Sequence, residues 1–172
     1  MGIAGTAGTS YTLTFAKTGL IPATQSITPT FGTASQVFLT TNAAGAASGA
    51  AFTTQPGVAI RDGAGNTVTS DNSSIVTVTV STGGSVVGTA TATASGGVAR
   101  FSTVGLSGPV GSYTLTFGVS GLTSATQGIA LSAGAATQLV LTTSAAGAAS
   151  GAAFTTQPVV AIRDGAGNTV TS

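Results

Sequence analysis

The chain of 172 residues lacks the side chains on which most enzyme and metal chemistry depends. It has no cysteine, histidine, tryptophan or glutamate, and only seven of its residues carry a formal charge. Without histidine, and with a single lysine, no base is available to activate a serine nucleophile. A net charge of +1 supplies no basic surface for phosphate groups, so no nucleic-acid partner is expected. We therefore expect no catalytic residues, no cofactor and no enzyme activity.

Long apolar runs are also missing from the sequence. Thr, Ser, Gln or Gly interrupts every stretch before about 18 strongly apolar residues accumulate, so no membrane span is expected. The first residues contain neither a basic nor an apolar segment, and we expect no secretion signal in them. Small residues dominate instead, because 108 of the 172 residues are Thr, Ala, Gly or Ser. Function is therefore expected to depend on shape and not on reactive groups.

An internal repeat organises the chain. Residues 36–70 recur at 138–172, an offset of 102, and 31 of the 35 positions are identical. The segment Tyr-Thr-Leu-Thr-Phe at 11–15 recurs at 113–117 with the same offset. A unit of about 102 residues has the size of one domain. We therefore expect a complete unit at 33–134, the last strands of a preceding unit at 1–32, and the first strands of a following unit at 135–172, as in a window cut from a longer array.

Short alternating segments within 33–134 predict β-strands. Residues 74–81 alternate Val with Thr, and residues 111–118 alternate Tyr, Leu and Phe with Thr. Seven or eight strands in about 100 residues, separated by glycine-rich turns, are typical of an antiparallel sandwich. The Ala-rich stretch 43–52 has no amphipathic stripe, and we expect it to be a loop or a segment that crosses between strands. Weaker strand patterns cover 36–41, 58–62, 67–69, 88–93, 97–101 and 126–132.

The alternation also predicts which side chains point inward. Apolar positions on one face should form the core, and the threonines between them should face solvent. Tyr113 is interpreted as a corner tyrosine, with its ring in the core and its hydroxyl on backbone. The expected core residues are Leu39, Ile60, Val78, Phe101, Leu115 and Phe117, and the expected outward residues are Thr77, Thr79, Thr114 and Thr116.

The turn Asp-Gly-Ala-Gly-Asn, at 62–66 and again at 164–168, is the only candidate for a metal site. Its oxygen-bearing side chains, weak candidates for calcium, are Asp62, Asn66, Asp164 and Asn168. Calcium takes six to eight oxygens and several carboxylates, whereas each turn offers one carboxylate and one amide. A tight turn stabilised by its own aspartate is therefore the favoured interpretation, and no metal is expected.

Other charged residues are interpreted in the same way. Asp62 and Asp71 form the only distinct carboxylate pair that a glycosidase could use within one unit, and solvated turn residues are the favoured interpretation. Arg61 and Arg163 are expected on the solvated face, where they would contribute little to stability.

Several segments carry a family resemblance. Residues 39–41 and 54–56, the stretch Val-Ala-Ile-Arg-Asp-Gly-Ala-Gly-Asn-Thr-Val at 58–68, and the segments 97–101 and 111–117 resemble the bacterial immunoglobulin-like repeats of invasin- and intimin-type surface proteins. The resemblance covers 33–134 and, through the partial copies, nearly the whole chain. It implies an immunoglobulin-like β-sandwich, an extracellular place on the bacterial surface or in a secreted protein, and a role as spacer or adhesive module.

Three functions are compared. The favoured hypothesis is a structural spacer whose partners are neighbouring repeats, because the repeats are nearly identical and are joined by about three residues. The alternative is an adhesive module for a host or cell-surface ligand, although neither an aromatic cluster nor a charge patch marks a binding face. An ice-binding protein is less favoured, because its Thr-x-Thr runs would need a short regular period. We also expect self-association, because 1–32 and 135–172 leave apolar side chains and strand edges uncovered.

Overall fold

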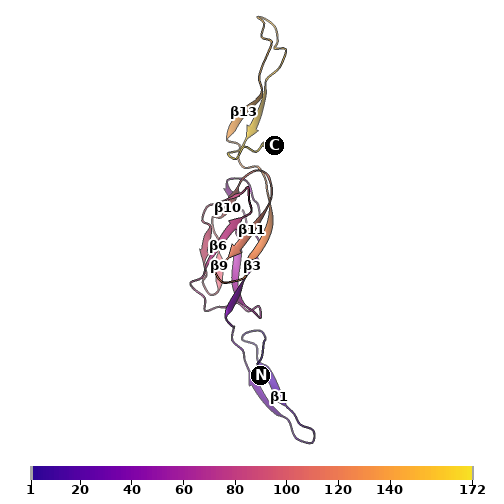
Figure 1. Cartoon of the computed structure of the whole chain (residues 1–172), viewed down its shortest axis with the longest axis vertical. Helices are drawn as coiled ribbons and strands as arrows, with labels where there is room; N and C mark the ends of the chain where they lie inside the picture. Colours follow the sequence, from indigo (N-terminus) through magenta and orange to yellow (C-terminus); the bar gives the residue numbers. More distant parts are fainter. Residues whose placement is uncertain (1, 172) are drawn as a thin grey trace.

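The computed structural model describes residues 2–171, and all regular elements in that range are β-strands. Figure 1 shows a long, narrow molecule in which a central body of strands is flanked at each end by one hairpin. Within residues 2–171 there is no helix with the length and apolar character needed to cross a membrane.

The central body consists of three antiparallel sheets. Their strand orders are β12-β11-β6-β8, β3-β5-β9 and β4-β10-β7. The expected fold class is confirmed as an all-β antiparallel sandwich. The strands are β3 (Ala34–Thr41), β4 (Ala50–Ala51), β5 (Gly57–Asp62), β6 (Ile75–Val80), β7 (Ser85–Val87), β8 (Thr91–Thr93), β9 (Val98–Arg100), β10 (Gly105–Ser107), β11 (Gly111–Gly118) and β12 (Ala125–Leu131).

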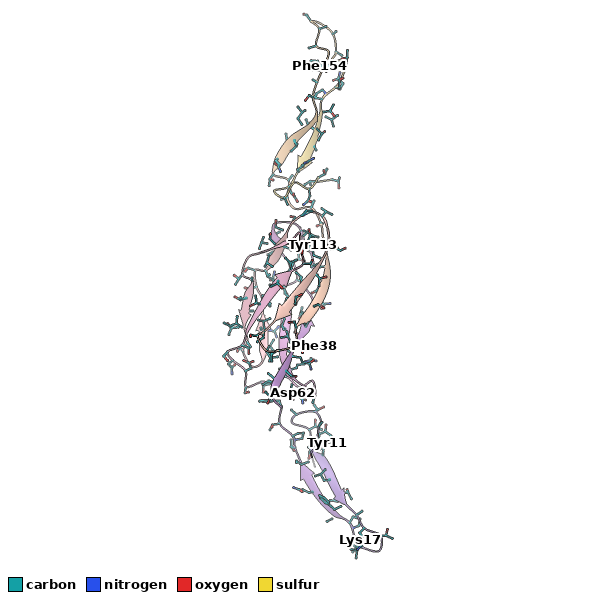
Figure 2. The ribbon with its side chains drawn as sticks, viewed as in Figure 1. Tyr11, Lys17, Phe38, Asp62, Tyr113 and Phe154 are labelled. Atoms are coloured by element: carbon teal, nitrogen blue, oxygen red, sulfur yellow. The ribbon has the colours of Figure 1, made fainter. Side chains whose placement is uncertain are left out.

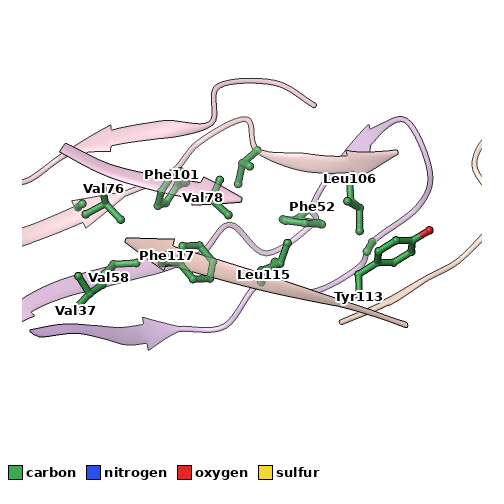
Figure 3. Close-up of a cluster of buried hydrophobic side chains, with 14 of the residues drawn as sticks. Val37, Phe52, Val58, Val76, Val78, Phe101, Leu106, Tyr113, Leu115 and Phe117 are labelled. Carbon is green, nitrogen blue, oxygen red and sulfur yellow. The ribbon is translucent and has the colours of Figure 1, made fainter. Parts of the chain in front are cut away.

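One apolar cluster lies between the sheets (Figure 3). Phe117 on β11 is fully buried, and its ring packs edge to face on Phe101 with 5.8 Å between the centroids. Alternation along β6 and β11 produces this cluster, because every second side chain points to the same face of a strand. Of the six expected core residues, five are buried, and Leu39 is partly buried and packs against them.

The expected outward threonines lie on the opposite face of the same strands. Thr77, Thr79 and Thr114 are exposed, and Thr116 is half-buried beside its cross-strand partner Thr79. The assignment of inner and outer faces is thus confirmed for both strands.

Two expected strands differ from the structure. Residues 67–69 form only a single bridge, between Thr67 and Arg61. The stretch 88–93 is interrupted at its start, because Gly88 has a φ of +76° and turns the chain between β7 and β8. The loop expected at 43–52 is confirmed as non-helical. It crosses between the sheets, with Ala44 bridged to Thr54 and Ala47 bridged to Ser132.

Each flanking segment forms a two-stranded hairpin. β1 (Tyr11–Phe15) pairs with β2 (Ala23–Ile27), and β13 (Gln138–Thr143) pairs with β14 (Val159–Arg163). By the 102-residue offset, β1–β2 corresponds to β11–β12 and β13–β14 corresponds to β3–β5. The same sequence therefore occurs in two environments: Phe117 is 0% exposed, whereas Phe15, at the equivalent position, is 51% exposed.

Candidate functional site at the repeat joints

The turn that the sequence marks as a metal candidate lies where the central body meets a hairpin. Figure 2 shows Asp62 at the end of the central body that faces the hairpin carrying Tyr11. We call the contact between residues 5–32 and turn 62–66 the first joint, and the contact between residues 108–134 and turn 164–168 the second joint. Among residues 2–171 no group of three or more Asp, Glu, His or Cys side chains could hold a metal ion.

The Asp62 carboxylate accepts four N–H hydrogen bonds. Its Oδ1 accepts from the backbone N–H groups of Ala64 and Asn66, at 3.0 and 2.8 Å. Its Oδ2 accepts from the backbone N–H of Gly32 at 2.7 Å and from the Asn66 amide at 3.0 Å. The Gly32 donor, followed by the Asn66 amide, lowers the pKa of Asp62 to about 2. Asp62 is only 2% exposed, so its interpretation as a solvated turn residue is wrong: residues that precede the unit cover it.

The backbone of the turn aims Asn66 away from its own unit. Gly65 has a φ of +86°, which only glycine adopts readily, and its N–H donates to the Asp62 carbonyl at 3.1 Å. The Asn66 side chain then contacts residues about 60 positions earlier in the chain. Its Oδ1 accepts from the Ala7 N–H at 2.9 Å, and its Nδ2 donates to the Gly5 carbonyl at 3.0 Å. Asn66 therefore binds the backbone of residues 5–7, the segment that leads into β1 of the preceding hairpin.

The second joint repeats this arrangement. Asp164, 1% exposed, accepts at Oδ2 from the Gly134 N–H and from the Asn168 amide, both at 2.8 Å. The Asn168 amide, followed by the Gly134 N–H, lowers the pKa of Asp164 to about 2. Asn168 donates from Nδ2 to the Gly108 carbonyl at 3.0 Å and accepts at Oδ1 from the Val110 N–H at 2.8 Å. We call Asp62 with Asn66, and Asp164 with Asn168, the two Asp–Asn clamps.

A tyrosine fixes the middle residue of each clamped segment. The buried Tyr113 donates its hydroxyl hydrogen to the Pro109 carbonyl at 2.8 Å, between the two residues that Asn168 holds. The Tyr11 hydroxyl accepts from the Thr6 N–H at 2.9 Å, again at the middle residue. The corner-tyrosine prediction is confirmed for Tyr113. At each joint the Asp and Asn side chains thus bind backbone atoms of the neighbouring segment, and the tyrosine of that segment holds its middle residue.

The clamps have the wrong polarity for a cation. The four candidate calcium ligands are brought together in two pairs, but each carboxylate is surrounded by N–H donors whose positive ends repel a metal ion. Asp71 is engaged in a different turn, where it accepts from the N–H groups of Ser73 and Ser74 at 3.1 and 2.9 Å. The carboxylates considered for glycosidase chemistry therefore act as hydrogen-bond acceptors.

The arginines beside the clamps also differ from expectation. Arg61 and Arg163 are half-buried, so their interpretation as fully solvated residues is wrong. The Arg61 guanidinium lies over the Phe38 ring, with 3.6 Å between Cζ and the centroid. Position 140 holds valine where the first copy has Phe38, so this stacking is not repeated at Arg163.

The two joints differ in one respect. At the second joint, loop 43–52 covers the clamped segment, and the Ser48 hydroxyl bonds both the carbonyl and the N–H of Gly108, at 3.0 and 3.2 Å. At the first joint, the corresponding place is an open groove of about 220 Å³, whose lining includes Gly5, Pro29, Thr30, Gly32 and Ala64.

Sequence reasoning missed the partners of the clamps. Gly32, Gly134 and the segments 5–7 and 108–110 contribute only backbone atoms, so no side-chain pattern marks them. A usable signal was the identity of both Asp-Gly-Ala-Gly-Asn turns at the repeat spacing, together with the glycine at 32 and at 134.

Comparison with known proteins adds only distant structural similarity. No protein-family model and no curated protein matches the chain. Among solved structures, a glycosyl hydrolase family 2 member from Bacteroides cellulosilyticus has a TM-score of 0.47 and 13% identity over 72% of this chain. A beta-glycosidase from Bacteroides vulgatus has a TM-score of 0.47 and 17% identity over 70% of this chain. A beta-glucuronidase from Parabacteroides merdae has a TM-score of 0.45 and 15% identity over 64%. The match spans 17%, 17% and 15% of these three chains, so their activities are not carried over to this chain.

Proposed function

We propose that the chain is a structural spacer, made of immunoglobulin-like units joined end to end, with no catalytic activity. The observation that carries this proposal is the recurrence of the same Asp–Asn clamp at both joints, 102 residues apart. A spacer must transmit position along its length, and this requires joints that hold neighbouring units in one orientation. A buried carboxylate with four N–H donors, next to an amide with all its groups bonded, meets that requirement.

The shortness of the connections supports the same role. β2 ends at Ile27 and β3 starts at Ala34, while β12 ends at Leu131 and β13 starts at Gln138. Connections of six residues, each bonded to a clamp through its glycine N–H, leave little freedom between units. The elongated arrangement in Figure 1 agrees with this.

The resemblance of the sequence to invasin- and intimin-type repeats supports a more specific proposal for the spacer. We place it in a bacterial surface or secreted protein of the adhesin type, where it would hold another part of the protein away from the cell. Its partners along the chain are the neighbouring repeats.

The proposal is tested by measuring how rigidly the first joint holds the β1–β2 hairpin. The chain has no cysteine, so Lys17→Cys and Ser120→Cys, both at exposed positions, allow two spin labels to be attached specifically. Pulsed electron–electron double resonance should give a narrow distribution of the distance between the two labels. Asn66→Ala should broaden it, because the Gly5 and Ala7 backbone groups lose their partner.

Asn168→Ala is the matched control. It makes the same change at the second joint, which does not lie between the two labels, and should leave the distribution narrow. A broad distribution in the unsubstituted chain, or a narrow one with Asn66→Ala, would contradict a rigid joint built on the clamp.

A further inference from the structure

In the central body, β3 contacts the region of β12. Each flanking hairpin carries the equivalent of only one side of this contact. The segment that leads into β12 lies beside the start of β3, where Gln36 and Thr123 form a parallel bridge. The Val37 N–H donates to the Thr123 carbonyl at 2.8 Å, and the Thr123 N–H donates to the Ser35 carbonyl at 3.0 Å. β2 corresponds to β12, and β13 corresponds to β3. Each pairs with only one strand in residues 2–171, so both outer edges are open.

The Ala-rich loop extends this contact in the central body. The Gln127 amide brackets Ala43, accepting from its N–H at 2.8 Å and donating to its carbonyl at 2.7 Å. Ser132 donates from its N–H to the Ala46 carbonyl and accepts at its own carbonyl from the Ser48 N–H, both at 3.0 Å. With the bond from the Ser132 hydroxyl to the Ala46 carbonyl at 3.0 Å, seven hydrogen bonds involving backbone atoms hold β3 and its following loop to the β12 region.

The positions that make this contact in the central body recur in the two hairpins, with one side of the contact in the hairpin at each end of the chain. Residues 145–154 repeat the loop sequence 43–52 without change and are exposed. At the other end, Gln25 and Thr30 stand at the positions of Gln127 and Ser132, and both are exposed. Thr30, Gly5 and Gly32 line the open groove of about 220 Å³ at the first joint. Their equivalents at the second joint, Ser132, Gly108 and Gly134, contact Ser48 of loop 43–52.

The hairpins also expose apolar side chains whose equivalents are buried in the central body. Phe154 is 44% exposed, whereas Phe52 at the equivalent position is 3% exposed. Leu139 is 73% exposed, whereas Val37 is 5% exposed. Figure 2 shows Phe154 and Lys17 toward opposite ends of the molecule, with the central body between the two hairpins. The two hairpins of one molecule therefore do not cover each other, whereas the hairpins of two molecules can meet.

We propose that the β13–β14 hairpin of one copy docks on the β1–β2 hairpin of a second copy, in the register used inside the central body. In this register Gln138 lies beside Ile21, the backbone of Ala145 is bracketed by Gln25, and the loop around Ser150 fills the groove at Thr30. The two surfaces differ, so the contact is heterologous and extends into open head-to-tail chains of molecules. The inference depends on contacts within this chain and not on the spacer role.

Association is tested by sedimentation velocity and light scattering on the full chain over a concentration series. The average mass should rise with concentration and pass beyond that of a dimer. Gln25→Ala removes two hydrogen bonds from each contact and should weaken association by about tenfold. Gln25 is exposed and makes no side-chain hydrogen bond within residues 2–171, so this variant keeps the fold of the monomer.

Gln127→Ala is the matched control, since it makes the same change at the equivalent position inside the central body. It should lower thermal stability and leave the association constant within about twofold. A chain that stays monomeric at millimolar concentration, or one whose association is equally weakened by both substitutions, would overturn the proposal.

Cross-linking tests the register directly. The Cα atoms of bridge partners in a sheet lie about 5 Å apart, a separation that a disulfide can span. Ile21→Cys combined with Gln138→Cys should therefore link successive copies on oxidation. The double variant should give a ladder of dimers, trimers and longer species, whereas each single variant should stop at the dimer. Products of the double variant that do not extend beyond dimers would contradict head-to-tail docking in this register.

Discussion

Replacing one phenylalanine at two equivalent positions tests whether the stabilising core is confined to the central body. Phe117 is 0% exposed and packs edge to face on Phe101, whereas Phe15 is 51% exposed. Truncating a fully buried phenylalanine to alanine costs about 3–5 kcal/mol, which includes the cavity that is left and the lost aromatic contact. At Phe15 only about half of the side chain is withdrawn from water, and about 1 kcal/mol is expected, confined to the hairpin.

Tyrosine fluorescence separates the two effects. The chain has two tyrosines and no tryptophan, so Tyr11→Phe leaves Tyr113, in the central core, as the only reporter. In urea, Phe117→Ala should lower the free energy of unfolding by about 3–5 kcal/mol, a large part of the 5–15 kcal/mol typical of a domain. Phe15→Ala should change it by less than about 0.5 kcal/mol. Equal losses from both substitutions, or a loss below about 1 kcal/mol for Phe117→Ala, would refute the assignment of the core.

Three further outcomes are expected. Gly134→Ala should loosen the second joint, because an added Cβ would overlap the Ser48 carbonyl oxygen. Gly32→Ala should be tolerated, because the atom nearest to its added Cβ would be 3.5 Å away. Thermal unfolding and protease sensitivity of the two variants test this difference. The folded-state pKa values of Asp62 and Asp164 lie near 2, below the ordinary 3.8, so the clamps should stabilise the joints fully above about pH 4 and lose that effect as the pH falls toward 2. The spin-label distribution should broaden in that range, and Asp62→Asn should give the broad distribution already at pH 7. Thr79→Ser, on the outer face, should change the free energy of unfolding by less than about 0.5 kcal/mol in urea.

The strands that the sequence predicted best are those with strict alternation. β6 and β11 lie within one residue of the expected 74–81 and 111–118, because one face of each is buried and the other is open. β4, β7 and β10 were missed. They have two or three residues each, Ala-Ala, Ser-Val-Val and Gly-Leu-Ser, and segments this short show no period. Their pairing is set by neighbours distant in sequence.

The same reasoning explains what was missed at the joints. The residue types at 62–66 correctly predicted a tight turn that is closed by its own aspartate. They carried no sign that Asp62 is buried, because Gly32, which contacts its carboxylate, belongs to the preceding segment of the repeat, as do residues 5–7, which bind the neighbouring Asn66. Burial that depends on a neighbouring unit is not visible in the local pattern of the buried residue.

The distribution of sequence identity between the two joints follows from how each clamp binds. The turns at 62–66 and 164–168 are identical, while the segments they hold differ: Gly-Thr-Ala at 5–7 against Gly-Pro-Val at 108–110. Every contact across a clamp is made to a backbone N–H or carbonyl, so the held segment can change its side chains without losing a bond. The Asp and Asn side chains, in contrast, have no substitute of the same shape and polarity. The turn folds with its own unit at the end of the central strand β5 or of β14, and it therefore presents preformed acceptors and donors to the neighbouring segment. The orientation of neighbouring units at each joint is thus determined by the Asp and Asn side chains of the turn. The neighbouring segment contributes only backbone groups that lie within hydrogen-bonding distance of them.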